Sequence, residues 1–363
     1  MSADNGIRIP PAGAPDTGDR VYTRREFGGL LLGAGAVIVG AASLPGNVHA
    51  TGPTPRRGGA VKIALNSQGT NDTFDGAKIL HPGDYLRCSS VYNYLTRLDS
   101  QARAQPELAE SFEPNANATR WLLRIRKDIK FHDGAPLTME DVAFSILRHK
   151  EDRVVSNAKQ LAGNIKDVKV DGPNSVVVEL AEPDADLPVL IGTFQFTIVK
   201  KGTYDFSSPV GTGAYKVKEF SPGVRTICVR NDNYWKPGQP YLDQFELFAI
   251  VDQVARVNAL LSGDVQMAID IRGPSIDQLN KSAIASPLVS KAPRYTAIQA
   301  AVDMAPGNNP DLGLALTYLI DRERVLKTVL RDNGVIGNDH PIMNGSPYYD
   351  ATLAPRKLDR DTS

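Results

Sequence analysis

The sequence contains few of the residues that build metal centres and disulfide frameworks. Among 363 residues there are two cysteines and five histidines, and none of these lies at zinc-ligand spacing from another. No Gly-x-x-x-x-Gly-Lys-Ser/Thr phosphate loop and no Gly-x-Ser-x-Gly nucleophile elbow occur. These absences argue against a zinc protein, a P-loop ATPase and an α/β-hydrolase. Whether Cys88 and Cys228 form a disulfide or pack as separate thiols stays open.

The sequence also lacks an excess of charge of either sign. Its 41 Lys and Arg residues balance 41 Asp and Glu residues, and the pI is near 7.0. A nucleic-acid-binding protein needs a basic excess, so we expect no nucleic-acid partner. With 42% hydrophobic and 23% charged residues, the chain is expected to fold around a core. At about 150 residues per domain, its length predicts about two domains.

Residues 1–50 predict an export signal. Arg24 and Arg25 precede an uncharged stretch, 28–44, that is mostly Gly, Ala, Leu, Val and Ile, and a small residue, Ala50, offers a cleavage site. The stretch is shorter than the roughly 20 residues that span a membrane, and the paired arginines resemble a twin-arginine signal. We therefore expect export, cleavage near Ala50 and a periplasmic mature protein. The alternatives are an uncleaved anchor and a glycine-rich dinucleotide loop in the same stretch.

Hydrophobic periodicity in the remaining chain predicts the α/β class. A flexible leader is expected at 51–59, and a polar loop follows the first strand at 66–76. Strands are predicted where apolar residues alternate, at 60–65, 121–126, 168–180 and 215–229 (both hairpins), 245–250 and 265–269. Helices are predicted over 88–98, after the capping residue Thr138, over 254–261, and over 311–330 with a restart at Asp321. The strand–helix–strand order of 245–269 favours a mixed or parallel sheet.

The titratable residues form no recognisable catalytic constellation. His132 and Asp133 lie in a turn, where a hydrogen-bonded loop histidine is more common than a general base. Glu140 and Asp141 stand at a helix start, where carboxylates act as caps. The glycine-rich turn 211–213 precedes a strand, so it lacks the helix N-terminus that would hold a phosphate. We expect no metal, no cofactor and a binding function.

Eight short segments carry a resemblance to a known family. In chain order they are PELAESF at 106–112, WLLRIR at 121–126, FHDG at 131–134, LTMEDVAF at 137–144, PVGTGAY at 209–215, NDNYW at 231–235, LLSGDVQ at 260–266 and ALTYLIDR at 315–322. In content and order they resemble the family 5 extracytoplasmic solute-binding proteins, which serve peptide and nickel ABC importers.

The resemblance implies a two-lobed α/β fold of the periplasmic-binding-protein type II, with an extra subdomain in the first lobe. It places the first lobe at 60–252, the inserted subdomain at about 99–195, and hinge strands near 245–252. The second lobe would cover 253–363. Because relatives continue past the equivalent of Tyr349, the resemblance also implies that the chain is truncated and the second lobe incomplete.

The resemblance further implies capture of a peptide or similar small solute between the lobes, by a monomer. The solute would pass to an inner-membrane ABC permease with separate ATPase subunits. Dipeptide, oligopeptide, nickel chelate, sugar and opine-like ligands remain open. The alternatives are an exported enzyme that uses the same export route and a truncated relative that no longer binds.

Loops at strand ends supply the candidate ligand-binding residues, which are Asn66, Ser67, Gln195, Phe196, Asp270 and Arg272. Asp270 and Arg272 are expected to pair with a ligand amine and carboxylate. The alternative for these two residues is that they are solvent-facing loop charges.

Overall fold

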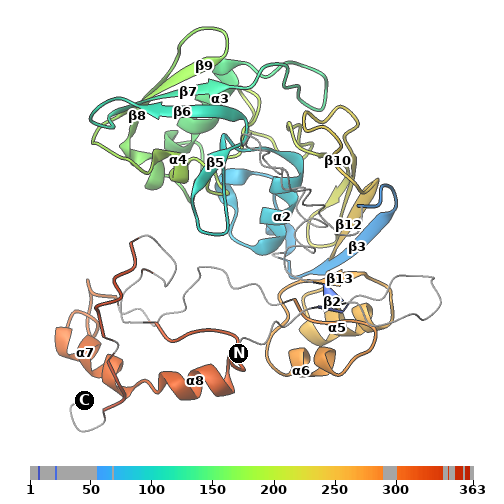
Figure 1. Cartoon of the computed structure of the whole chain (residues 1–363), viewed down its shortest axis with the longest axis vertical. Coiled ribbons are helices and arrows are strands. Elements are labelled where there is room, and N and C mark those ends of the chain that lie inside the picture. The colour runs from blue at the N-terminus through green and yellow to red at the C-terminus, as the bar shows by residue number, and fades with distance from the viewer. Residues whose placement is uncertain are drawn as a thin grey trace, which may run out of the picture. The chain divides into compact units, whose positions relative to one another are not determined.

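The computed structural model describes residues 55–67, 69–288, 301–337, 342, 348–354 and 356–359, and two short strands nearer the N-terminus (Figure 1). These strands, β1 (Ile7–Arg8) and β2 (Val21–Tyr22), pair antiparallel. The rest of the predicted export signal lies outside the described residues. No helix in the described ranges is both long and apolar enough to span a bilayer.

The chain divides into two compact units. The first contains Met1–Asp99, Arg103–Ile271 and Ser282–Ser286, and the second contains Ser100–Ala102, Arg272–Lys281 and Pro287–Ser363. The predicted division of the complete protein into lobes at Asp252 stays a prediction.

A five-stranded mixed sheet organises the first unit, with the strand order β10-β11-β12-β3-β13. The central strand β3 (Ala60–Leu65) runs parallel to β12 (Gln244–Ala249) on one side and to β13 (Met267–Ala268) on the other. The hairpin of β10 (Tyr215–Ser221) and β11 (Arg225–Arg230) extends the sheet antiparallel beyond β12. Figure 1 shows β3, in blue, beside β12 from much later in the chain. The three parallel strands therefore end at one edge of the sheet.

A separate antiparallel sheet lies within the range predicted for the inserted subdomain. Its strands are β6 (Ala109–Pro114), β7 (Arg120–Ile125), β9 (Ser175–Leu180) and β8 (Ile165–Val170), in that spatial order. Helix α3 (Met139–Leu147) packs against β8 and β9. Alternate residues of β9 are buried, as the apolar alternation predicts, namely Val176, Val178 and Leu180.

Side-chain caps begin two of the helices where the sequence predicts them. The Thr138 hydroxyl accepts from the Asp141 backbone N–H at 3.3 Å, and the Asp141 carboxylate accepts from the Thr138 N–H at 2.8 Å, so α3 begins with a capping box. Helix α5 (Gln253–Leu261) begins at Asp252, whose carboxylate accepts from the Ala255 N–H at 2.7 Å. The predicted strand–helix–strand unit is confirmed as β12, α5 and β13.

The prediction of a single helix over 88–98 is wrong. Helix α2 covers Pro82–Val91, and the later part of the apolar run forms strand β4 (Thr96–Leu98), which pairs antiparallel with β5 (Ala104–Pro106). The helix stops because Tyr92 takes extended backbone angles, with φ −114° and ψ 164°. Buried residues occur in both elements, Cys88 and Val91 in α2 and Thr96 in β4, and hydrophobic periodicity alone does not separate such a short helix from such a short strand.

The remaining elements are short or belong to the second unit. The first unit also contains the single turns η1 (Gly69–Asn71), η2 (Gly76–Lys78), η3 (Arg148–Lys150) and η4 (Leu161–Asn164), and the short helix α4 (Leu187–Leu190). The second unit contains α6 (Pro274–Asn280), α7 (Pro310–Leu319) and α8 (Arg322–Thr328). Helix α8 begins at the predicted restart, Asp321, whose carboxylate accepts from the Arg324 N–H at 2.8 Å. No residue of α7 or α8 is buried.

Both cysteines are buried as free thiols in the core beside the five-stranded sheet. Burial raises the pKa of the Cys228 thiol to about 12 and raises the pKa of the Cys88 thiol well above its ordinary value. Both side chains therefore pack as small apolar groups rather than as reactive thiolates.

Close backbone packing at the end of α2 generates a test of the fold. A Cβ atom on Gly213 would lie 2.4 Å from the Val91 carbonyl carbon, so we expect Gly213→Ala to lower the free energy of unfolding. Overpacking of this kind costs about 1–3 kcal/mol. Gly163→Ala is the matched control, because a Cβ there would meet no atom within 4 Å. Urea unfolding midpoints measure both changes, and equal midpoints for the two variants would contradict the packing argument.

Candidate functional site

The carboxyl ends of the three parallel strands converge on one edge of the sheet. Pairing continues to the end of each strand, because the Ile250 N–H donates to the Leu65 carbonyl at 2.9 Å and the Ile269 N–H donates to the Ala64 carbonyl at 3.0 Å. Asn66 and Asp270, both predicted ligand-binding residues, follow β3 and β13 at this edge. Open α/β sheets hold their ligands at such edges.

Arg256, from α5, donates hydrogen bonds to the segments that follow β12 and β13 at this edge. Its guanidinium is buried and donates at 2.7 Å to the carbonyls of both Ile250 and Val251, which follow β12. It also donates to the Asp270 carbonyl at 3.0 Å. Asp270 itself has a left-handed backbone with φ 58°. The segments after β12 and β13 are therefore held by one side chain.

Asn66 and Ser67 play different parts in the loop that follows β3. The Asn66 Oδ1 accepts from the Ser67 N–H at 3.0 Å, while the Asn66 amide nitrogen has no hydrogen-bond partner in the described ranges. The Ser67 hydroxyl donates to Asp72 Oδ2 at 2.8 Å and accepts from the Gly69 N–H at 2.9 Å. The Ser67 hydroxyl therefore holds the loop together, and a ligand contact by the partly buried Asn66 stays a prediction.

Gln195 and Phe196 lie beside η2, the turn that follows the same loop. A Cβ on Gly76 would come within 3.0 Å of the Gln195 carbonyl oxygen, so these backbones are in contact. The Phe196 ring is only 1% exposed and lies 4.5 Å from the His149 ring, measured between centroids. The Gln195 side-chain oxygen is buried without a partner among the described atoms. Phe196 thus packs in the core, and a direct ligand contact by either residue stays a prediction.

Arg272 belongs to the second unit, whereas the other five predicted ligand-binding residues belong to the first. The division falls directly after Ile271, between Asp270 and Arg272. The pairing of these two side chains with opposite ends of a ligand therefore stays a prediction.

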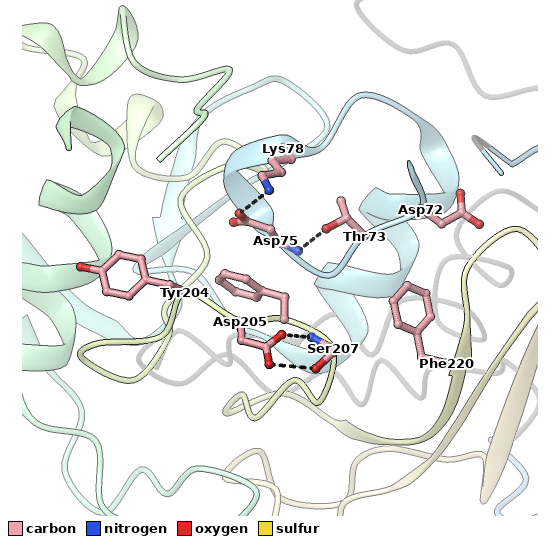
Figure 2. A pocket seen from close by; sticks show the side chains of 9 residues that line it. Asp72, Thr73, Asp75, Lys78, Tyr204, Asp205, Ser207 and Phe220 are labelled. Carbon is pink, nitrogen blue, oxygen red and sulfur yellow. Dashed lines mark hydrogen bonds and ion pairs between the residues drawn. The ribbon is translucent and has the colours of Figure 1, made fainter. Parts of the chain in front are cut away.

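An open cavity of about 270 Å³ lies beside the loop that follows β3 (Figure 2). Residues of three segments line it, namely Asp72, Thr73, Asp75 and Lys78 from the loop and η2, Tyr204, Asp205, Phe206 and Ser207 from a second loop, and Phe220 from β10. Figure 2 shows Asp75 and Lys78 on one side and Asp205 with Ser207 on the other. Because Asp72 also accepts from the Ser67 hydroxyl, the cavity and the sheet edge share the same loop.

Two of the three carboxylates around the cavity are paired with buried arginines. Asp72 lies 2.7 Å from Arg87, and Asp75 lies 3.0 Å from Arg148. The third carboxylate, on Asp205, accepts at 2.9 Å from the Ser207 backbone N–H and at 3.0 Å from the Ser207 hydroxyl, and these bonds lower the pKa of Asp205. The cavity can therefore hydrogen-bond a polar or cationic group.

The loop histidine is structural, as the sequence predicts. His132 Nδ1 accepts from the Gly211 N–H at 3.3 Å, so the ring proton lies on Nε2, which donates to the Gly213 carbonyl at 3.0 Å. Burial lowers the pKa of His132, which favours this neutral ring. In the part of the chain that the structure describes, no group of three or more His, Cys, Asp and Glu residues is arranged to hold a metal ion.

Two buried arginines that hold carboxylates of the cavity lining, Arg87 and Arg148, are absent from the residues predicted from the sequence. The available signal is an arginine placed beside apolar helix residues, Arg87 before Cys88 and Arg148 after Leu147. Such a residue predicts a buried carboxylate partner, but the pattern does not say which carboxylate it is.

Comparison with known proteins identifies relatives of this chain. Residues 103–362 match the family described as bacterial extracellular solute-binding proteins, family 5 Middle. The chain is 26% identical to the oligopeptide-binding protein AppA of Bacillus subtilis over 262 residues, which are 68% of this chain and 47% of AppA. It is 26% identical to the glutathione-binding protein GsiB of Escherichia coli K12 over 278 residues, which are 74% of this chain and 53% of GsiB. The chain spans about half the length of these curated relatives.

A solved relative shows the same fold. It is the ABC transporter-associated periplasmic binding protein DppA from Helicobacter pylori, in complex with the peptide STSA. The TM-score is 0.73 at 20% sequence identity, and the match covers 85% of this chain and 65% of DppA. This similarity confirms the predicted α/β fold of the periplasmic-binding-protein type.

His149, which packs against Phe196, generates a prediction about pH. Burial, with a smaller effect of the neighbouring Arg148 charge, lowers the pKa of His149 from 6.5 to about 3. The unfolded chain takes up a proton at this histidine below about pH 6.5, and the folded chain does not, so stability falls as the pH falls from 6.5 toward 3. The slope is about 1 kcal/mol per pH unit.

The variant His149→Gln should remove that part of the pH dependence. We expect the stability of the unsubstituted protein, relative to the variant, to decrease between pH 6.5 and pH 4 in urea unfolding. His81→Gln, the same substitution at an exposed histidine, is measured alongside as the control. Parallel stability curves for the unsubstituted protein and His149→Gln would refute the assignment.

Proposed function

Since the chain belongs to the bacterial extracellular solute-binding proteins of family 5, we propose that it is the substrate-binding component of an ABC importer. The family match over residues 103–362 is the observation that carries this proposal. The ligand class is a peptide or a similar small solute. Support comes from the names of the relatives, which are an oligopeptide-binding protein, a glutathione-binding protein and a protein solved with the peptide STSA.

The proposed ligand seat is the carboxyl edge of the parallel strands. Asn66 offers an amide nitrogen there, and Asp270 follows β13 at the same edge. Asp270 would accept from a ligand ammonium group, and Arg272 would bind a ligand carboxylate. Backbone hydrogen bonds would hold the middle of a peptide without selecting its side chains. A ligand that contacts both lobes favours their closure, because it binds the closed state more tightly than the open one.

The same proposal assigns the cellular setting. The mature protein acts outside the cytoplasm, in the periplasm, after export by the twin-arginine signal of residues 1–50 and cleavage near Ala50. It works as a monomer that delivers the solute to an inner-membrane permease, while separate ATPase subunits supply the energy. It catalyses no reaction of its own and requires no cofactor or metal ion.

Calorimetric titration of the purified protein with tri-alanine and with glutathione tests the proposal. We expect saturable binding of at least one of them. Asp270→Asn should weaken that binding about tenfold or more, because a hydrogen bond to a charged group contributes about 1.5–3 kcal/mol. Asn66→Ala should weaken it less, since the Asn66 amide is neutral.

The matched control for this titration is Asp128→Asn. Asp128 is exposed and shares the left-handed backbone of Asp270, with φ 62° against 58°, but it lies outside the proposed seat. This variant should bind the peptide as the unsubstituted protein does. The proposed function fails if neither compound binds, and the assignment of Asp270 fails if Asp270→Asn and Asp128→Asn bind equally.

A further inference from the structure

The loop between β3 and η2, residues 66–76, is here named the edge loop; its residue 68 lies outside the described ranges. It carries the proposed ligand residue Asn66 at its start, and its shape depends on a buried carboxylate near its middle. Asp72 is only 6% exposed, and its Oδ2 atom accepts from the Ser67 hydroxyl at 2.8 Å. The same oxygen accepts from the Gly223 N–H at 3.0 Å. Asp72 thus joins the start of the edge loop to the turn between β10 and β11.

The turn and the edge loop also touch directly. A Cβ atom on Gly223 would lie 2.8 Å from the Gly69 Cα, and Gly223 has a φ of +74° that a side chain would strain. The close approach requires glycine at this position. It leaves the edge loop no room to shift toward the turn.

Arg87 holds Asp72 in this place. The arginine comes from α2, is 3% exposed, and donates from Nη2 to Asp72 Oδ2 at 2.7 Å. Its Nη1 donates to Asp84 Oδ1 at 2.8 Å, and its Nε donates to the Thr226 hydroxyl of β11 at 3.1 Å. One guanidinium therefore joins α2, the edge loop and the five-stranded sheet.

Asp84 binds the same arginine and also contacts the edge loop directly. Its Oδ1 accepts from the Thr73 backbone N–H at 3.0 Å as well as from Arg87. Two buried carboxylates thus share one cation, and burial raises the pKa of Asp84. A lysine in place of Arg87 would keep the charge but lose the planar fork that reaches three partners at once.

We propose that Arg87 is a positioning residue for the ligand seat. It fixes Asp72, Asp72 fixes Ser67, and Ser67 fixes the orientation of the adjacent Asn66 at the sheet edge. The proposal rests on the proposed function where it concerns ligand affinity. Its statement about the edge loop is independent of any ligand.

Hydrogen–deuterium exchange of the full chain tests the structural part. In Arg87→Lys we expect the backbone amides of residues 69–75 to exchange about tenfold faster or more, because local opening of the loop no longer breaks the bond from the Arg87 guanidinium to Asp72. The control is Val178→Ala, which lowers stability through the core of the four-stranded sheet, far along the chain from the loop. It should leave exchange in 69–75 unchanged.

The same variants test the effect on ligand affinity. Titration with tri-alanine and glutathione should show about tenfold weaker binding for Arg87→Lys and unchanged binding for Val178→Ala. Asp72→Asn should reproduce the faster exchange and the weaker binding, because the amide keeps the shape of the side chain but loses its charge. If Arg87→Lys does not fold, Asp72→Asn tests the same proposal.

The possible results separate the two proposals. Unchanged exchange in 69–75 for Arg87→Lys and Asp72→Asn, or equal acceleration in Val178→Ala, overturns the positioning role. Faster exchange with unchanged affinity overturns the link between the edge loop and the ligand. If the unsubstituted protein binds neither compound, the proposed function fails, while the exchange experiment still decides whether Arg87 fixes the loop.

Discussion

Leu65 and Ala249 are register partners at the ends of β3 and β12, and β13 continues the parallel arrangement on the other side of β3. These strands are far apart in the sequence, so their pairing closes long loops and loses chain entropy. The core that contains Ile63, Leu65 and Leu247 offsets that loss by removing apolar surface from water. The positions of Asn66 and Asp270 both depend on this pairing, because it decides which strand ends lie side by side.

Buried ion pairs constrain the edge loop, in addition to the apolar core that supports the paired strands. Burying an ion pair brings little net stability, since the desolvation of both charges opposes their attraction. Asp72 with Arg87 and Asp75 with Arg148 are therefore better explained by the single loop conformation that they impose. The two anchors differ in completeness: Arg87 uses Nε, Nη1 and Nη2, whereas the Arg148 Nε is buried without a partner among the described atoms. The guanidinium of Arg148 instead lies 5.0 Å from the centroid of the Phe206 ring.

Local patterns predict those parts of the fold that local physics determines. The alternation over 168–180 and the Thr138 cap both correspond to elements in the structure, because a pleated strand and a helix terminus are recognised from a few neighbouring residues. The single helix predicted over 88–98 is wrong, because this segment contributes buried residues to both α2 and β4. That burial depends on tertiary packing, which a local pattern does not show.

The candidate site is predicted less completely, and for the same reason. Asn66 and Asp270 follow strands, so their place at one edge is implied once the strands are parallel. Arg87 pairs with Asp72 across the fold, and no spacing in the sequence encodes that pair. Phe196 belongs to the apolar run 196–199, most of which is core, so its place near a strand-end loop does not determine where its ring points.

Three buried arginines are committed to contacts within the first unit. Arg87, Arg148 and Arg256 direct their guanidinium groups inward, to carboxylates or backbone carbonyls of the same unit. The cavity beside the edge loop keeps charges of both signs in its lining, because Asp205 and Lys78 line it as well. A polar group that enters the cavity can therefore meet a carboxylate or an ammonium group, while the three arginines keep the surrounding segments in place.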